Sequence, residues 1–327
     1  MLISLLGLGF LIFVHELGHF LAARKLGVGV DEFSIGFGPR IISRQVGNTR
    51  YSLAAIPLGG FVRLDQICQD EKSPLARILI ALAGPIVNLL FAFLAFIFVA
   101  LIGIPHQTTK IGEVFPNKPA AKAGLMPGDK VVAVNGVEVG KWTEMTEMVN
   151  VNRSVPITLQ VRRGQIPYEV TLAPEIANDR AMLGVRSAGE FISVKYGFGE
   201  AVSKGAELTW TNAYAAIDGF VKLFSRALPM DALGGPIMIL QEGASRANAG
   251  FADLISFLAF LSVNLFVLNL LPLPVLDGGN ILFNIYESVL GRPVSLRIRN
   301  AAVMVSAILL LGLTAMVCFN DLMRVVK

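Results

Sequence analysis

Four long runs of apolar residues, separated by more polar segments, organise this chain. They extend over residues 1–23, 78–104, 254–276 and 301–319. Each is long enough to cross the hydrocarbon core of a bilayer, which takes about 20 residues as a helix. The pattern therefore predicts four transmembrane helices. We expect the first to be retained and not cleaved as a signal peptide, because it lacks a basic n-region and a small-residue cleavage site.

The segment after the first run has a different pattern. Residues 28–64 form short extended pieces punctuated by glycine, with strands predicted at 49–53 and 61–64. This pattern indicates a small sheet of hairpins, which we expect at the cytoplasmic membrane face because it directly follows the first helix. Two roles stay open. A free sheet edge could accept a substrate as an added strand, or the segment could be a plain connector.

A soluble domain is predicted from about residue 110 to 187. Residues 120–139 couple a short helix to a turn, a strand and a second turn, and this succession resembles a PDZ domain. Strands predicted at 157–162 and 168–172 complete a small barrel-like sheet. PDZ domains bind peptide C-termini by strand addition. In the circularly permuted bacterial form, the resemblance implies a peptide-binding loop at Leu183, Gly184 and Val185.

An amphipathic helix is predicted from about residue 200 to 228. Its apolar residues recur at spacings of four and three, and charged residues interrupt it too often for a membrane span. We expect it to lie at the outer membrane interface. It could serve as a structural brace or as a substrate gate.

Composition and charge agree with a membrane protein. Of the 327 residues, 54% are hydrophobic and 16% charged, which excludes the ordinary soluble class. Basic residues concentrate in the loops at 24–77 and 292–299, so these loops are predicted to be cytoplasmic, with both termini and residues 105–250 on the outer side. The net charge of +4 needs no nucleic-acid partner to explain it. Cys68 and Cys318 imply no disulfide framework.

The first apolar run contains His15-Glu16-Leu17-Gly18-His19. Residues four apart share one face of a helix, so His15 and His19 can present two imidazoles to one metal, with Glu16 beside them as a base for the attacking water. The alternative is a pair of hydrogen-bonded core histidines. Ionisable residues are costly inside a membrane, which favours the metal site. The third histidine of the chain, His106, is expected at the membrane interface.

A protease zinc site typically has three protein ligands and an open position. The candidate for the third ligand is Asp277, at the end of the third apolar run. Pro272 and Pro274 stop an ordinary helix there, and the glycine pair after Asp277 allows a sharp turn. Broken helices are tolerated at membrane depth where they line a cavity. Asp277 could instead cap the helix that follows.

Together, the HExxH motif at 15–19 and the NxxPxPxLDG motif at 269–278 resemble the paired signatures of the site-two protease family of intramembrane zinc metalloproteases. The flanking residues 33–38, 57–60 and 235–237 are similar to its bacterial regulator-of-sigma-E protease branch, and the resemblance covers nearly the whole chain. Many members of that branch carry two tandem PDZ domains, whereas this chain has room for one.

The resemblance implies an α-helical membrane protein with four transmembrane helices, a membrane-associated β-hairpin region and an inserted PDZ-like α+β domain. The expected domains are the first transmembrane helix with HExxH (1–27), a cytoplasmic-side membrane-associated β-sheet (28–72), the second transmembrane helix (73–106), the PDZ-like domain on the outer side (107–190), an amphipathic interfacial helix and connector (191–250), the third transmembrane helix with NxxPxPxLDG (251–279), and a cytoplasmic loop with the fourth transmembrane helix (280–327).

The resemblance also implies roles for single residues. His15, His19 and Asp277 would bind Zn²⁺, and Glu16 would move the proton of the attacking water. Substrate contacts are expected from Asn269, Pro272, Pro274, Gly59, Gly60 and Phe61. The implied protein is a zinc metalloendopeptidase of the bacterial inner membrane, with its active site towards the cytoplasm. It would cut transmembrane segments of single-pass proteins, such as anti-sigma factors or remnant signal peptides, while the PDZ-like domain excludes bulky ectodomains.

Two other classes of function fit less well. A noncatalytic scaffold with a structural zinc site conflicts with the coordination position that three protein ligands leave open. A metal transporter would need further polar residues along its helices, and it has no use for a PDZ-like domain.

Overall fold

The computed structural model describes residues 2–153, 155–177, 180–225 and 234–326. These form two compact units. One consists of residues 1–102 and 196–327, and the other of residues 103–195.

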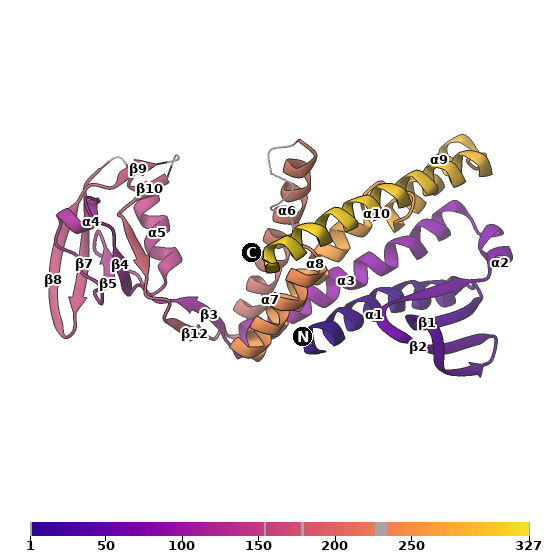
Figure 1. The fold of residues 1–327 in the computed structure, drawn as a ribbon, viewed down its shortest axis with the longest axis horizontal. Coiled ribbons are helices and arrows are strands. Elements are labelled where there is room, and N and C mark those ends of the chain that lie inside the picture. The colour runs from indigo at the N-terminus through magenta and orange to yellow at the C-terminus, as the bar shows by residue number, and fades with distance from the viewer. Residues whose placement is uncertain (1, 154, 178–179, 226–233, 327) are drawn as a thin grey trace. The chain divides into compact units, whose positions relative to one another are not determined.

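Four helices of the first unit are long and apolar enough to cross a membrane (Figure 1). They are α1 (Leu2–Lys25), α3 (Pro74–Ile102), α8 (Phe251–Asn269) and α10 (Leu296–Val326). The four long apolar helices predicted from the sequence are thus confirmed. The third is shorter than its apolar run, because the chain leaves the helix after Asn269, just before two prolines.

Helix α3 is the centre of the first unit. It packs against α1, α8, α6 (Phe198–Phe224) and α9 (Asp277–Leu290). Small residues allow these contacts to be close: a Cβ on Gly18 of α1 would lie 2.5 Å from the carbonyl oxygen of Ala83. The helix that carries both histidines therefore rests directly on α3. The buried core between α3, α6 and α8 contains Ala92, Ala95, Phe96, Ala213, Ala259, Val263 and Val267.

Two further helices of this unit are α2 (Gln66–Asp70) and α7 (Pro236–Ala249). Helix α7 lies in a stretch that the sequence pattern assigned to a connector. The buried carboxylate of Asp321 in α10 accepts hydrogen bonds of 3.0–3.1 Å from three backbone N–H groups at the start of α7. These bonds join the C-terminal end of α10 to α7. The predicted end of the amphipathic helix near residue 228 lies outside the described residues.

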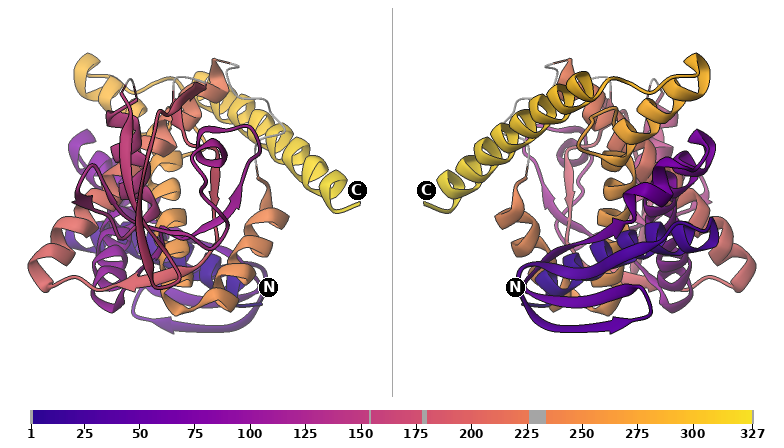
Figure 2. Two further views of the ribbon diagram at one scale, coloured as in Figure 1. Left: turned by 90° about the vertical axis from the view of Figure 1, so that its left-hand side faces the viewer. Right: turned by 90° about the vertical axis from the view of Figure 1, so that its right-hand side faces the viewer.

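A long hairpin of β1 (Val30–Val46) and β2 (Thr49–Leu64) follows α1 and lies beside it (Figure 2). Residues 30–35 pair with 60–64, and residues 40–46 pair with 49–54, both antiparallel. Glu32, only 2% exposed, accepts two hydrogen bonds from Arg40 and one from Ser52, which hold the two halves together. The hydrogen bonds from Arg40 lower the pKa of Glu32 despite its burial. The far half of the hairpin exposes apolar side chains, namely Phe37, Ile41, Ile42, Val46 and Ile56.

The second unit is a small α+β body. A four-stranded antiparallel sheet has the order β6 (Val137–Glu138), β5 (Lys130–Val134), β7 (Ile157–Arg163), β8 (Ile166–Leu172). Three two-stranded ladders join β4 (Ile111–Val114) to β11 (Val185–Ser187), β3 (Ile104–Gln107) to β12 (Phe191–Val194), and β9 (Glu175–Ala177) to β10 (Arg180–Met182). The helices are α4 (Pro119–Lys122) and α5 (Trp142–Val151).

A buried carboxylate supports the sheet of this second unit. Asp129 is fully buried and accepts hydrogen bonds from Arg163, from the Tyr168 hydroxyl and from the Met126 N–H. Burial alone would raise the pKa of Asp129, but the hydrogen bonds from Arg163 and Tyr168 outweigh it and the pKa lies below its ordinary value.

Candidate metal centre

Helix α1 places His15 and His19 on one face, one turn apart, as the sequence spacing predicts. Their imidazole rings lie edge to face with centroids 4.8 Å apart, and their Nε2 atoms are 3.2 Å apart. Gly84 of α3 makes room for both rings, since a Cβ there would lie 2.3 Å from His19 Nε2 and 2.9 Å from His15 Cε1. The histidine pair thus occupies a space that only glycine at position 84 leaves open.

Asp277 reaches the histidines because the backbone between α8 and α9 is not helical. Turns at residues 270–276 replace the helix, and α9 starts at Asp277 itself. The next two residues are glycines that pack onto this turn. A Cβ on Gly278 would lie 2.3 Å from the Leu271 carbonyl oxygen, and one on Gly279 would lie 2.4 Å from that of Leu273. The glycine pair therefore allows the first turn of α9 to rest on the broken segment.

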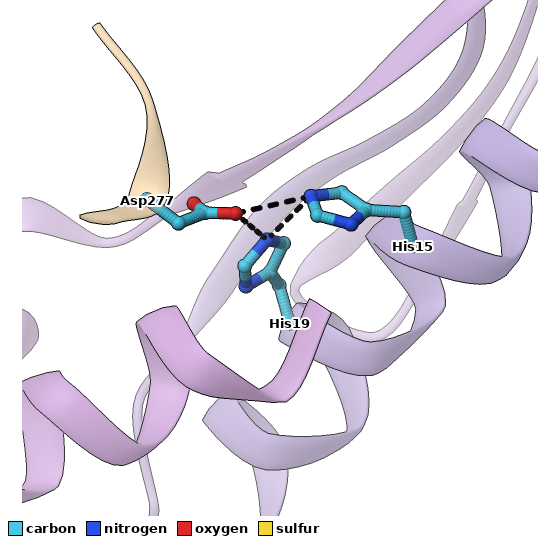
Figure 3. Close-up of side chains that lie close together, drawn as sticks. All are labelled: His15, His19 and Asp277. Atoms are coloured by element: carbon cyan, nitrogen blue, oxygen red, sulfur yellow. Dashed lines mark hydrogen bonds and ion pairs between the residues drawn. The ribbon is translucent and has the colours of Figure 1, made fainter. Parts of the chain in front are cut away.

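Three potential metal donors converge in this place (Figure 3). Asp277 Oδ2 lies 3.1 Å from His15 Nε2 and 3.4 Å from His19 Nε2. Oδ2 is buried, and no hydrogen bond to it is found within the described chain. Tetrahedral zinc with bonds of roughly 2.0–2.1 Å separates its ligand atoms by about 3.3–3.4 Å. The spacing and the chemistry of the three donor atoms fit one face of a zinc tetrahedron and leave the fourth position for water or substrate.

Glu16 is held beside this group by the hairpin. Its Oε2 accepts a hydrogen bond of 3.0 Å from the backbone N–H of Val62 in β2. Gly60 brings the strand close, because a Cβ there would lie 3.5 Å from Glu16 Cγ and 2.7 Å from the Ser34 carbonyl oxygen. Glu16 lines the same cavity as the three donor atoms, a placement that a general base would require.

A cavity of about 830 Å³ opens onto these groups. His15, Glu16, His19 and Asp277 all line it, together with the predicted substrate residues Asn269 and Phe61. The lining also includes Gln69, Arg299 and the ion pair of Arg77 in α3 with Glu287 in α9. The cavity can therefore admit water to groups that the surrounding helices would otherwise keep dry.

The other predicted substrate residues lie outside the described lining of this cavity. Pro272 and Pro274 belong to the broken segment. Gly59 has a φ of +117°, and a Cβ there would lie 2.0 Å from Cε2 of Phe37, so it shapes the hairpin. Gly60 is the close-approach position described above.

The predicted peptide-binding loop belongs to the second unit. Gly184 has a φ of +77°, and a Cβ there would lie 2.1 Å from Lys118 Cβ. The carbonyl of Leu183 accepts a hydrogen bond from Ala120, and Val185 begins β11, which pairs with β4. The loop is thus tied to the start of α4 through its backbone.

Several groups at the site have no signal in the sequence. The Val62 N–H and the Ile80 carbonyl, which lies 2.8 Å from His19 Nδ1, are backbone atoms that any residue type supplies. The pairing of Arg77 with Glu287 joins residues 210 positions apart. None of these contacts can be predicted from the sequence alone, because each depends on how the chain folds.

The whole chain is similar to known proteins. The model of "Peptidase family M50" matches residues 3–313. A "Putative zinc metalloprotease" of Campylobacter jejuni is 34% identical over 347 residues, which cover 99% of this chain and 94% of the relative. A protein of the same name from Rhizobium meliloti is 31% identical, with 95% and 93% covered. The "Regulator of sigma-W protease RasP" of Bacillus subtilis is 28% identical, with 97% and 96% covered.

Proposed function

Because this chain belongs to peptidase family M50 and is a membrane-embedded zinc metalloprotease, we propose that it hydrolyses transmembrane segments of single-pass proteins at a zinc held by His15, His19 and Asp277. The proposal depends on one observation: His15 Nε2, His19 Nε2 and Asp277 Oδ2 lie 3.1–3.4 Å from one another. Glu16 lines the same cavity. Packing in a helical core does not require two histidines and an aspartate around one point.

Each residue has a distinct task in this proposal. Zinc bound there supplies Lewis-acid polarisation of the scissile carbonyl and makes water acidic enough to ionise near pH 7. Glu16 accepts the proton of the attacking water and passes it to the leaving amine. The Val62 N–H holds the Glu16 carboxylate in place for both transfers.

The hairpin is the proposed substrate clamp. A helical substrate hides its peptide bonds in internal hydrogen bonds, so it must be drawn into an extended form before it is cut. Residues 60–64 pair with β1 along one edge, and Val62 turns its N–H away from that partner to Glu16. A substrate strand beside Phe61 and Val62 would place its backbone along the cavity.

The exposed apolar half of the hairpin supports a place in the membrane for this sheet. Ile41 and Ile42 are 65% and 63% exposed, which favours contact with lipid over contact with water. We place the active site towards the cytoplasm, in line with the basic residues of the flanking loops. The exposed Trp210 and Tyr214 of α6 suit the interfacial position that we propose for this helix.

The substrates we propose are anti-sigma factors already shortened on the outer side, together with remnant signal peptides. The sigma-W regulator among the relatives supports the first class. The second unit would act as a PDZ-like filter against bulky ectodomains. Its helix–turn–strand succession and its loop at 183–185 support this assignment.

The decisive experiment is Glu16→Gln in the full chain, with a membrane-spanning test substrate in liposomes. We expect zinc content to be unchanged and cleavage to fall by at least about 100-fold, the usual contribution of general acid–base catalysis. Glu71→Gln, the same substitution at an exposed carboxylate, is the matched control. Normal cleavage by Glu16→Gln would refute the mechanism. Single-pass fragments that accumulate in membranes with the Gln variant would identify natural substrates.

A further inference from the structure

Each histidine of the centre has a second ring nitrogen, Nδ1, whose hydrogen-bond partner determines the tautomer of the ring. A neutral imidazole carries its proton on one nitrogen and binds a metal through the other. His19 Nδ1 lies 2.8 Å from the carbonyl oxygen of Ile80. Since a carbonyl only accepts, Nδ1 of His19 must carry the proton, and this leaves the lone pair of Nε2 facing Asp277.

The corresponding partner of His15 is Asn88 of α3. His15 Nδ1 lies 3.2 Å from Nδ2 of the Asn88 amide. The Asn88 side chain is fully buried, and its Oδ1 has no hydrogen-bond partner in the described structure. In this orientation the amide N–H would donate to Nδ1. The proton of the ring would then lie on Nε2, where it blocks metal binding.

The two ends of an amide have the same shape, so their assignment follows from the hydrogen bonds that they make. Exchanging them places Oδ1 beside His15 Nδ1 and moves no other atom. The ring then carries its proton on Nδ1 and donates it to Asn88. The exchange gives the Nδ1 proton of His15 an acceptor and frees the lone pair of His15 Nε2 for the metal.

We propose that Asn88 is a positioning residue: its amide oxygen accepts the Nδ1 proton of His15 and so selects the tautomer that can bind the metal. The inference rests on the proposed function in one respect, that His15 is a zinc ligand. Asn88 acts through His15 and touches neither zinc nor substrate.

The packing of α3 supports this role. Ile80, Gly84 and Asn88 are four residues apart and share the face of α3 that meets α1. One supplies a carbonyl to His19, one leaves space for both rings, and one holds His15. The backbone carbonyl of Asn88 accepts a hydrogen bond of 2.8 Å from the buried Ser262 of α8, so this contact leaves the amide of the Asn88 side chain to His15. The histidine pair of α1 thus faces a matching row of three residues on α3.

The test compares Asn88→Leu with Asn88→Asp in the full chain, by competition with a zinc chelator. Leucine has the branched shape of asparagine but cannot accept the proton, so we expect zinc affinity to fall about 10–100-fold, as for other outer partners of metal ligands. Aspartate accepts the proton as asparagine does and should stay within about threefold of the parent. If Asn88 only fills space, the order is reversed, because leucine packs well and a buried carboxylate is costly. Should the leucine variant fail to fold, Asn88→Ala makes the same comparison.

A second readout is the visible spectrum of the Co²⁺-substituted protein, which reports the ligands themselves. We expect the leucine variant to change it and the aspartate variant to preserve its bands. Ser262→Ala, which removes a contact to the backbone of Asn88 only, should change neither the affinity nor the spectrum. Parental zinc affinity in Asn88→Leu would overturn the inference while His15→Ala still loses zinc. Parental affinity in His15→Ala would instead overturn the proposed site.

Discussion

His15 Nε2 and Asp277 Oδ2 lie 3.1 Å apart, although one belongs to the first helix of the chain and the other to the start of α9. If both hold zinc, His15→Ala, His19→Ala and Asp277→Asn should each lower zinc content well below one ion per chain, because each removes one of three protein ligands. Elemental analysis of purified protein measures this. His106→Ala, at the remaining histidine of the chain, serves as the control and should keep its zinc. Full zinc content in all three site variants would exclude this centre.

Gly84→Ala should damage the centre although it replaces none of the three proposed metal ligands. The added Cβ would lie 2.3 Å from His19 Nε2, a distance that forces the ring to move. We expect loss of zinc and of cleavage, although alanine favours the helix by about 1 kcal/mol over glycine.

The matched control is Gly312→Ala in α10, where a Cβ would meet nothing within 4 Å. It should retain zinc and activity and melt no lower than the parent. An active Gly84→Ala protein would show that the rings have more room than the structure gives them.

The ion pair of Arg77 and Glu287 should influence the position of Asp277, a residue that it does not contact. It joins α3 to α9, the helix that begins with Asp277, and its side chains are only 12% and 21% exposed. Removing one partner leaves a largely buried charge, so Arg77→Ala or Glu287→Gln should cost about 1–3 kcal/mol and reduce cleavage. Thermal melting in detergent and the cleavage assay measure the two effects.

A double-mutant cycle separates the pair from its surroundings. If the two side chains stabilise the protein through their mutual interaction, the Arg77→Ala/Glu287→Gln double variant should lose less unfolding free energy than the two single variants lose in sum. Simple additivity would mean that the two residues act independently.

Gly184→Ala should alter substrate selection if the second unit is a filter. The position combines a positive φ with a Cβ only 2.1 Å from Lys118 Cβ, so alanine must displace the loop at 183–185. We expect cleavage of substrates with intact ectodomains to rise relative to trimmed ones, while cleavage of trimmed substrates stays at the parental rate. Competition between the two substrates in one assay gives this ratio.

Gly164→Ala is the control for backbone strain alone, since Gly164 also has a positive φ, +62°, but an added Cβ there meets nothing. An unchanged ratio in Gly184→Ala would argue against a filtering role for the loop.

The second unit should lose stability in acid through Asp129. Its pKa is lower in the folded chain than its ordinary value of about 4, so folding favours the ionised form. The stabilisation is therefore complete above about pH 4 and is lost as the pH falls through the lower, folded-state pKa. Asp129→Asn should remove this dependence, so that the difference in unfolding temperature from the parent narrows with falling pH. Trp142, which packs on the core of this unit, reports its unfolding when Trp210 is replaced by Phe.

The sequence predicts those parts of the site that depend on local spacing. The i, i+4 histidines of α1 need only a helix to meet, and Pro272 and Pro274 mark the break that frees Asp277. Helix lengths follow from apolar runs. Contacts made by backbone atoms, such as the Val62 N–H on Glu16, carry no residue signature, because every residue except proline has that group.

Helix α7 was not predicted for a related reason. Its residues 236–249 include alanine, glycine, serine and charged residues without a long apolar run, so nothing in the pattern distinguishes it from a connector. Its position depends on distant partners. The carboxylate of Asp321 accepts hydrogen bonds from its first N–H groups, and a Cβ on Gly243 would lie 2.8 Å from Ser4 Oγ of α1.

The division of the proposed centre between α1 and α9 has a consequence for biosynthesis. When the ribosome has synthesised the first 270 residues, the chain already contains His15, Glu16 and His19. The two histidines alone cannot form a three-ligand site. Until Asp277 has emerged and α9 has folded against α3, the growing chain would hold metal poorly and cut nothing. The order of synthesis alone would therefore keep this protease inactive while its own first helices enter the membrane.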